Sequence, residues 1–207
     1  MTTTLRPGLA PLAAALLACA ACAGRTSPPE PGTSQGSPPD LRGASVMVLP
    51  VQAVHEVGGD ADAELSFGLR DRRAGVTWIF PARLEEALAR APALDTRVHG
   101  LSVGTFSRAE VRRVGDPLYG ELRRLAELVD AEVALLPLSA VAVRVPDGGA
   151  SVRFTVATVH VRTGRVLWFG VVEGEPHPAG DPRGLASAVD VLARTLLWYV
   201  PGGGATG

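Results

Sequence analysis

The sequence predicts an α+β domain in which a mixed sheet with flanking helices ends in a C-terminal antiparallel meander. An apolar run closed by proline, residues 45–51, is typical of a buried strand. Two later segments, 81–91 and 116–129, place apolar residues at helical spacing. Three strand-like stretches rich in apolar and β-branched residues then follow in succession, at 131–145, 151–161 and 165–172.

Length and composition limit the architecture and the function. The chain has 207 residues, and at roughly 150 residues per domain this predicts a single core. A hydrophobic content of 46% with 20% charged residues is normal for a globular protein and argues against general disorder. The net charge of −1 offers no electrostatic basis for binding nucleic acid.

Residues 1–18 have the three-part form of an export signal, with Arg6 near the start, an apolar stretch over 9–17 and small residues before Cys19. About nine apolar residues are too few to span a hydrocarbon core of ~30 Å as a helix. The segment ending Leu-Leu-Ala-Cys19 resembles the lipobox of bacterial lipoproteins, which implies cleavage before Cys19 and acylation of its thiol. Cys22 is the alternative lipidation site, and an ordinary cleavable signal is the third interpretation. Both cysteines precede the domain, so no disulfide is expected within it.

Residues 19–43 are expected to form a lipidated tether, because proline, serine and glycine dominate the segment and no apolar periodicity is present. A flexible coil of this length reaches on the order of 25 Å. The single globular domain is expected over 44–200. A glycine-rich, disordered tail is expected over 201–207.

The first half of the domain is the less regular. Residues 52–77 show no clear pattern after the first strand. Pro81 then starts a helix that Pro92 stops, and 94–103 is predicted to be a short strand. The apolar face of the helix consists of Leu84, Ala87, Leu88 and Ala91.

The second half is more regular. Asp116-Pro117 is a typical helix start, with Asp as cap and Pro in the first turn. The meander follows, and Thr163-Gly164 is expected to join its last two strands as a two-residue hairpin loop. An amphipathic helix over 185–196 closes the domain. The predicted order is therefore β-α-β-α-β-β-β-α.

This order, together with the phrase Val-His-Val-Arg-Thr-Gly-Arg-Val-Leu-Trp at 159–168, resembles the periplasmic domain of the group containing CsgG, LpoB and the TolB N-terminal domain. The resemblance spans about 45–198. It implies a non-enzymatic lipoprotein that works by contacting other proteins, with no catalytic residues. The chain has no additional pair of long alternating hairpins of the kind that lines a membrane barrel, so a pore is not expected.

The densest polar cluster is His55-Glu56 followed by Asp60, Asp62 and Glu64. Its spacing departs from a calcium loop, because the sixth position carries Leu65 where glycine is needed, so a solvated acidic loop is the favoured interpretation. The other histidines stand singly, at positions 99, 160 and 177, and no serine lies in a Gly-x-Ser-x-Gly motif. No metal site, cofactor or catalytic residue is therefore predicted.

Aromatic residues are the remaining candidates for a binding surface. Trp78 and Phe80 precede a predicted helix, and Trp198-Tyr199 end the last one. Aromatic side chains of this kind serve either as interface anchors or as core residues at the start of a helix. Trp168 alternates with small or apolar neighbours along a strand and is expected to pack on the sheet.

The function predicted from the sequence is that of an outer-membrane lipoprotein facing the periplasm, which binds a protein partner in envelope assembly, secretion or cell-wall regulation. The outer membrane is favoured because Ala20, rather than Asp, follows Cys19. Two alternatives remain open: a module that binds an envelope glycan or peptide, and a hydrolase that uses the acidic loop near His55. A homo-oligomer is also left open.

The anchor gives the first testable prediction. Metabolic labelling with a clickable palmitate analogue is expected to mark the wild-type protein and the Cys22→Ala variant, and to fail in Cys19→Ala, because only a free thiol at the cleavage site accepts the diacylglycerol. Labelling that persists in Cys19→Ala and disappears in Cys22→Ala would move the site to Cys22.

Overall fold

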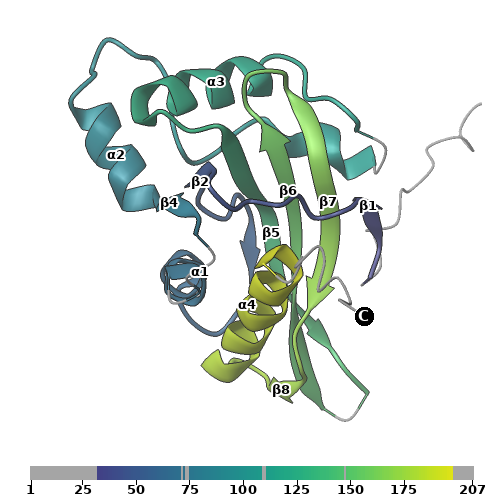
Figure 1. Ribbon diagram of the computed structural model, residues 1–207. Coiled ribbons are helices and arrows are strands. Elements are labelled where there is room, and N and C mark those ends of the chain that lie inside the picture. Colours follow the sequence, from purple (N-terminus) through teal and green to yellow (C-terminus); the bar gives the residue numbers. More distant parts are fainter. Residues whose placement is uncertain (1–31, 71, 73–74, 109–110, 147, 198–207) are drawn as a thin grey trace, which may run out of the picture.

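The structure is a computed structural model that describes residues 32–197, apart from 71, 73–74, 109–110 and 147. The predicted signal peptide, both cysteines, Trp198 and Tyr199 lie outside the described residues. The chain forms one mixed sheet with helices on both of its faces (Figure 1). This confirms the predicted α+β class. None of the described helices is long and apolar enough to cross a membrane.

Six strands follow one another across the sheet in the order β1-β7-β6-β5-β2-β4, while β3 extends the sheet beside β5 and β8 beside β6. The strands β2, β4 and β5 are parallel, and β5, β6 and β7 form the predicted antiparallel meander. Their bounds are β1 Ser34–Gly36, β2 Ser45–Val48, β3 Val54–His55, β4 Thr77–Ile79, β5 Val133–Arg144, β6 Gly149–His160, β7 Arg165–Glu173 and β8 His177–Pro178.

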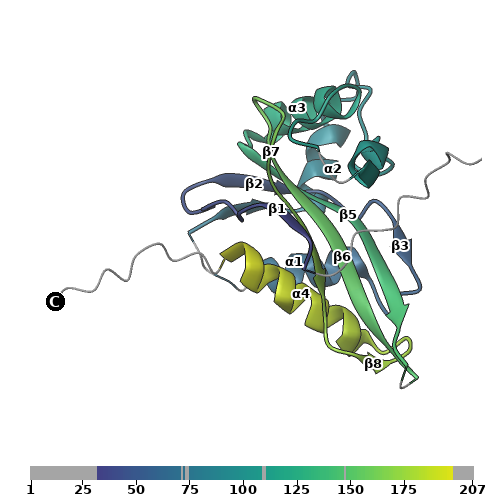
Figure 2. The ribbon, with the colours of Figure 1, turned by 90° about the vertical axis from the view of Figure 1, so that its right-hand side faces the viewer.

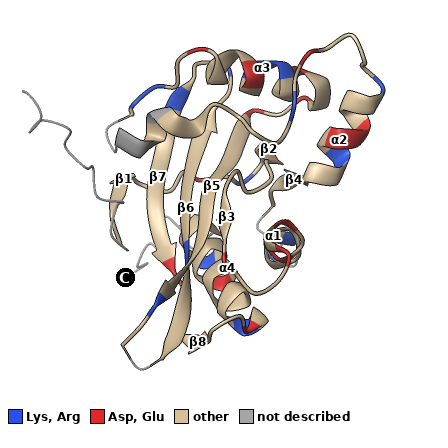
Figure 3. Cartoon of the chain, turned by 180° about the vertical axis from the view of Figure 1, so that it is seen from behind, with Lys and Arg blue, Asp and Glu red and all other residues tan. Residues whose placement is uncertain are grey.

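The central strands are buried on both faces. In β2, Val46 and Val48 pack into one hydrophobic cluster while Met47 packs into the other, as the alternation of side chains along a strand requires. The continuous apolar runs of β2 and β5 are therefore explained by helices on both sides of the sheet. Charged residues lie mainly on helices and loops, and the long strands of the meander are uncharged over most of their length (Figure 3).

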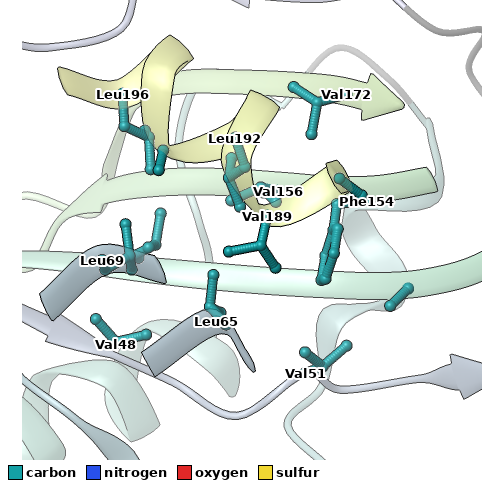
Figure 4. Close-up of a cluster of buried hydrophobic side chains, with 14 of the residues drawn as sticks. Val48, Val51, Leu65, Leu69, Phe154, Val156, Val172, Val189, Leu192 and Leu196 are labelled. Atoms are coloured by element: carbon teal, nitrogen blue, oxygen red, sulfur yellow. The ribbon is translucent and has the colours of Figure 1, made fainter. Parts of the chain in front are cut away.

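Helices α1 (Ala61–Arg70) and α4 (Pro182–Leu197) cover one face, and α2 (Pro81–Ala89) and α3 (Leu118–Val129) cover the other, together with the 3-10 helix η1 (Val103–Arg108). The side view separates the two layers (Figure 2). Beneath α1 and α4, Leu65 and Leu69 face Val189 and Leu192 above the strands (Figure 4).

Local sequence explains where the helices begin. The Asp60 carboxylate accepts hydrogen bonds from the backbone N–H groups of Asp62 and Ala63, both at 3.0 Å, and so caps α1. Pro81 occupies the first turn of α2, as predicted. Pro117, rather than the predicted Asp116, is the N-cap of α3. Asp116 lies one residue earlier, and its carboxylate accepts a hydrogen bond from Gly120 N–H in the first turn at 3.1 Å.

The predicted strand at 94–103 is wrong, because this segment forms a loop that leads into η1. Its backbone is held by one side chain instead of a neighbouring strand. The Gln52 amide donates to the carbonyl of Val98 at 3.0 Å and accepts from Leu101 N–H at 2.9 Å. These bonds satisfy one carbonyl and one N–H of the loop without a sheet partner.

Several elements appear where no regular structure was predicted. Helix α1 and the strand β3 lie within 52–77, β4 begins at the end of that segment, and β1 lies within the expected tether. β1 pairs with β7 in antiparallel register, Gln35 opposite Phe169, so backbone bonds hold a segment that has no apolar pattern. The β6–β7 connection is also longer than predicted, since β6 ends at His160 and β7 begins at Arg165.

The close approach of α4 to the end of β7 requires a glycine at position 174. A Cβ added there would lie 2.5 Å from Ala188 N and 3.0 Å from Ser187 C, which are both backbone atoms. We expect Gly174→Ala to lower the free energy of unfolding by about 2 kcal/mol, because a backbone clash cannot be relieved by a change of rotamer. Urea unfolding monitored by circular dichroism measures the loss.

The matched control is Gly115→Ala. A Cβ at this position meets nothing within 4 Å and its φ is not positive, so the free energy of unfolding is expected to change by less than about 0.5 kcal/mol. Equal effects of the two substitutions would contradict the packing of α4 on β7.

Candidate functional site

The acidic cluster predicted from the sequence forms the beginning of α1 rather than a loop. Asp60 caps the helix, and the half-buried Asp62 carboxylate accepts a hydrogen bond of 2.7 Å from the N–H of Val51, three residues after β2. Burial raises the pKa of Asp62, and the hydrogen bond from Val51 opposes this shift. Two members of the cluster therefore have structural roles: Asp60 caps α1, and Asp62 links α1 to the segment that follows β2.

The histidines do not converge on this cluster. His55 is exposed on β3, and His99 lies on the loop after α2, with its Nε2 3.6 Å from Glu85 Oε1. Within the described part of the chain, no three side chains of His, Cys, Asp or Glu are grouped so as to hold a metal ion. His55 lies on β3, whereas Asp62 and Glu64 of the acidic cluster lie in the first turn of α1.

The aromatic residues predicted as binding candidates lie together at one edge of the sheet. Trp78 is in β4, the last strand of the sheet order, and Phe80 immediately precedes α2. Both are half-buried and pack against the cluster beneath α1 and α4. Part of each side chain therefore serves the core, and part remains at the surface.

Helix α1, whose Arg70 reaches this edge, also carries an exposed aromatic residue. Phe67 is 62% exposed. It lies one helical turn before Arg70, whose guanidinium carbon is 5.2 Å from the centre of the Phe80 ring, within the range of a cation–π contact. We define the α1–β4 surface as Phe67, Arg70, Trp78 and Phe80.

Residue type and position, which indicated Trp78 as a candidate, do not reveal two features of this surface. Phe67 belongs to a helix that was not predicted, although the cap Asp60 and the spacing of Leu65 and Leu69 are signals of α1. In addition, the Trp78 indole N–H is buried without a hydrogen-bond partner among the described residues. A buried donor without a hydrogen-bond partner lowers the stability of the folded state, and this donor belongs to the edge strand β4.

The third tryptophan has the role predicted for it. Trp168 is only 2% exposed and packs beneath α4. A Cβ added to Gly170 would lie 2.1 Å from the Trp168 ring, so the glycine makes room for the indole. Trp198 and Tyr199 lie outside the described residues.

Open pockets occur elsewhere on the described surface. One, of about 570 Å³, lies at the end of α3 between Arg123, Asp130 and Arg162. Another, of about 510 Å³, follows β1, β7 and α4 beside Trp168. A third, of about 410 Å³, lies at the β6–β7 connection. The acidic cluster and His55 line none of the three.

No family model matches the chain, and no curated protein matches it by sequence. Solved structures with a similar outline include envelope lipoproteins. The LpoB C-terminal domain from Salmonella enterica is 16% identical, with a TM-score of 0.39, over 64% of this chain and 83% of that one. The PelC dodecamer from Paraburkholderia phytofirmans is 18% identical, with a TM-score of 0.39, over 79% and 94% of the two chains. Lipoprotein GNA1162 from Neisseria meningitidis is 17% identical, with a TM-score of 0.36, over 67% and 84%.

These likenesses concern the arrangement of helices and strands. At this identity and similarity they carry no conclusion about partners, assembly or activity, and those questions depend on the residues of this chain.

The position of Asp62 gives a testable pH dependence. The pKa of Asp62 in the folded state is raised above the ordinary value of 3.8, so the folded state binds the proton more tightly than the unfolded state. The free energy of unfolding therefore falls as the pH rises from the unfolded-state pKa through the folded-state pKa and Asp62 ionises. Asp62→Asn removes the titration and keeps an acceptor for Val51 N–H. Its free energy of unfolding, relative to wild type, is therefore expected to increase from pH 3.5 to pH 7 in urea titrations.

Asp62→Ala is the companion variant. It leaves Val51 N–H unpaired and is expected to be about 1 kcal/mol less stable than Asp62→Asn at pH 7. A stability difference between wild type and Asp62→Asn that is constant with pH would show that burial does not govern this carboxylate.

Proposed function

We propose that this chain is a lipid-anchored protein of the bacterial outer membrane that faces the periplasm and acts, without catalysis, by binding an envelope protein through the α1–β4 surface. The observation that carries the proposal is Phe67, an aromatic side chain 62% exposed, which lies on α1 one helical turn before the arginine that covers the Phe80 ring. Such a surface is what a protein interface needs at its centre.

The composition of the surface supports this role. Trp, Phe and Arg are enriched at protein interfaces, and a few such residues supply most of the binding free energy. Full burial of a Phe side chain contributes about 1.5–3 kcal/mol. Arg70 is already oriented over Phe80, so a partner would meet a partly ordered surface.

The position at the sheet edge also favours a contact. β4 has three residues and pairs with β2 on one side, and no further described strand pairs with it on the other. Edge strands present backbone groups that a partner can use. α1 and β4 together therefore offer apolar side chains and a strand edge in the same place.

The sequence of the N-terminus supports the location. Cys19, preceded by an export signal and followed by a proline-rich segment, is consistent with a lipid anchor that holds the domain near the membrane. The alternative of a hydrolase is less favoured, because Asp60 and Asp62 serve the start of α1.

The test compares two exposed apolar residues. Affinity capture from crosslinked membranes is expected to enrich an envelope protein with wild type, and Phe67→Ala is expected to reduce the recovered partner at least ~ten-fold, because an interface anchor is lost. Val54→Ala, at a position on β3 that is 47% exposed, is expected to retain it. Since Phe67 is largely exposed, thermal unfolding of the variant should remain close to wild type.

Equal recovery of the partner with Phe67→Ala and Val54→Ala would exclude the α1–β4 surface. If the only captured protein is a second copy of the chain, and light scattering shows an oligomer that Phe67→Ala dissociates, the surface mediates self-association rather than binding to a different envelope protein.

A further inference from the structure

The β6–β7 connection carries a row of two arginines and a histidine across three neighbouring backbone segments. His160 at the end of β6 pairs with Arg165 at the start of β7, and Arg165 pairs in turn with Arg113 through an isolated antiparallel bridge. Residues that pair directly across antiparallel strands place their side chains on the same face. The row therefore presents two guanidinium groups and an imidazole together.

The backbone geometry brings the two arginines especially close. Val114 N–H donates to Gly164 O at 2.8 Å and Val166 N–H donates to Arg112 O at 2.9 Å, so these bonds flank the Arg113–Arg165 pair rather than joining it. Such a non-hydrogen-bonded pair has the shorter Cα separation, about 4.5 Å in general, and the closer side chains. Like charges placed opposite each other in this way destabilise a sheet.

The described part of the chain does not neutralise this row. No described carboxylate forms an ion pair with Arg113 or Arg165. Arginine is nevertheless the cation in most of the ion pairs among the described residues. Both arginines are exposed. A bound anion would relieve the repulsion between them.

The same residues line an open pocket of about 410 Å³, whose described lining is Arg113, His160, Thr163 and Arg165. Thr163 Oγ1 lies 3.2 Å from His160 Nδ1 and accepts a hydrogen bond of 3.3 Å from Arg165 N–H. These contacts order the loop that forms one wall of the pocket.

The β6–β7 connection beneath the pocket is held against α3 by a hydrogen bond and by close packing. Tyr119 Oη donates a hydrogen bond of 2.9 Å to Arg162 O, and a Cβ added at Gly164, where φ is +67°, would lie 2.9 Å from the Tyr119 ring. The connection is thus packed against α3. Donors held on an ordered backbone lose little entropy when they bind a ligand.

We propose that Arg113, His160 and Arg165 form a binding site for a phosphate group. The planar guanidinium fork matches the oxygens of phosphate. Two adjacent forks with an imidazole beside Arg165 match a tetrahedral group with several charged oxygens better than a single carboxylate, which has two. The group belongs either to a soluble phosphate compound or to a phospholipid headgroup. This site is distinct from the α1–β4 surface.

The test uses the full-length chain in zwitterionic detergent micelles and in phosphate-free buffer. Inorganic phosphate is added at constant ionic strength while amide chemical shifts are followed by NMR. Saturable shifts are expected at Arg113, His160, Thr163 and Arg165. The double variant Arg113→Gln, Arg165→Gln is expected to bind phosphate at least ~ten-fold more weakly, with its remaining spectrum unchanged.

The matched control is Arg144→Gln, which removes an exposed arginine at the far end of β5 and is expected to leave the phosphate affinity unchanged. Shifts that do not saturate, or that weaken equally in Arg144→Gln, would overturn the proposal, because they would show only general attraction of anions. If the whole spectrum of the double variant is shifted, its fold has changed, and the single variant Arg113→Gln is titrated in its place. Weaker phosphate binding by this variant supports the site, and unchanged binding refutes it.

The source of the phosphate group is distinguished by repeating the titration with phosphatidylglycerol in the micelles. A headgroup that occupies the pocket would weaken the apparent affinity of wild type for inorganic phosphate and shift the same amides. If phosphatidylglycerol has no effect while inorganic phosphate still saturates the site, the ligand is a soluble phosphate compound.

Discussion

The rest of the structure depends on β5. Its first half is buried on both faces, and it joins the parallel part of the sheet to the antiparallel part. On one side it pairs in parallel with β2, and on the other it pairs in antiparallel with β6. Residues 133–138 are all buried, and 133–136 alternate between the cluster beneath α1 and α4 and the cluster beneath α2 and α3. Because β5 contributes to both hydrophobic clusters, the two helical layers cannot form independently of this strand. The surfaces that carry the proposed contacts lie at the outer edges of these layers.

Long, strongly patterned segments were predictable because their own side chains decide their structure. Helices α2, α3 and α4 and the three strands of the meander all have an apolar periodicity that matches their burial. Helix α1 also has such a pattern in Ala61, Leu65 and Leu69, but the neighbouring acidic residues favoured the interpretation of a solvated loop. The carboxylate of Asp60 in fact marks the helix start.

Short or irregular segments could not be predicted, because residues distant in sequence determine their structure. The 94–103 segment was predicted to be a strand, yet it is a loop in which the distant Gln52 side chain pairs with the carbonyl of Val98 and the N–H of Leu101. β1 has only three residues, with no apolar pattern, and depends on its hydrogen bonds with β7. Such pairings become visible only when the tertiary arrangement is known.

The same distinction applies to the functional surfaces. Trp78 and Phe80 were recognisable as candidates from residue type and position, whereas Phe67 required α1, and the pairing of Arg113 with Arg165 required the register of two segments far apart in the sequence. A site composed of neighbours in sequence can be proposed from a motif. A site composed across strands needs the structure.

The central functional claim is that Phe67 lies at a protein interface in the cell. Incorporation of a photoreactive phenylalanine analogue in place of Phe67, followed by irradiation of intact cells, tests this most directly. The account predicts a discrete crosslinked protein from position 67 and none from the same analogue in place of Val54, the other exposed large apolar residue of the described chain. Crosslinking from position 67 only to lipid, or to the same set of proteins as from position 54, would contradict it.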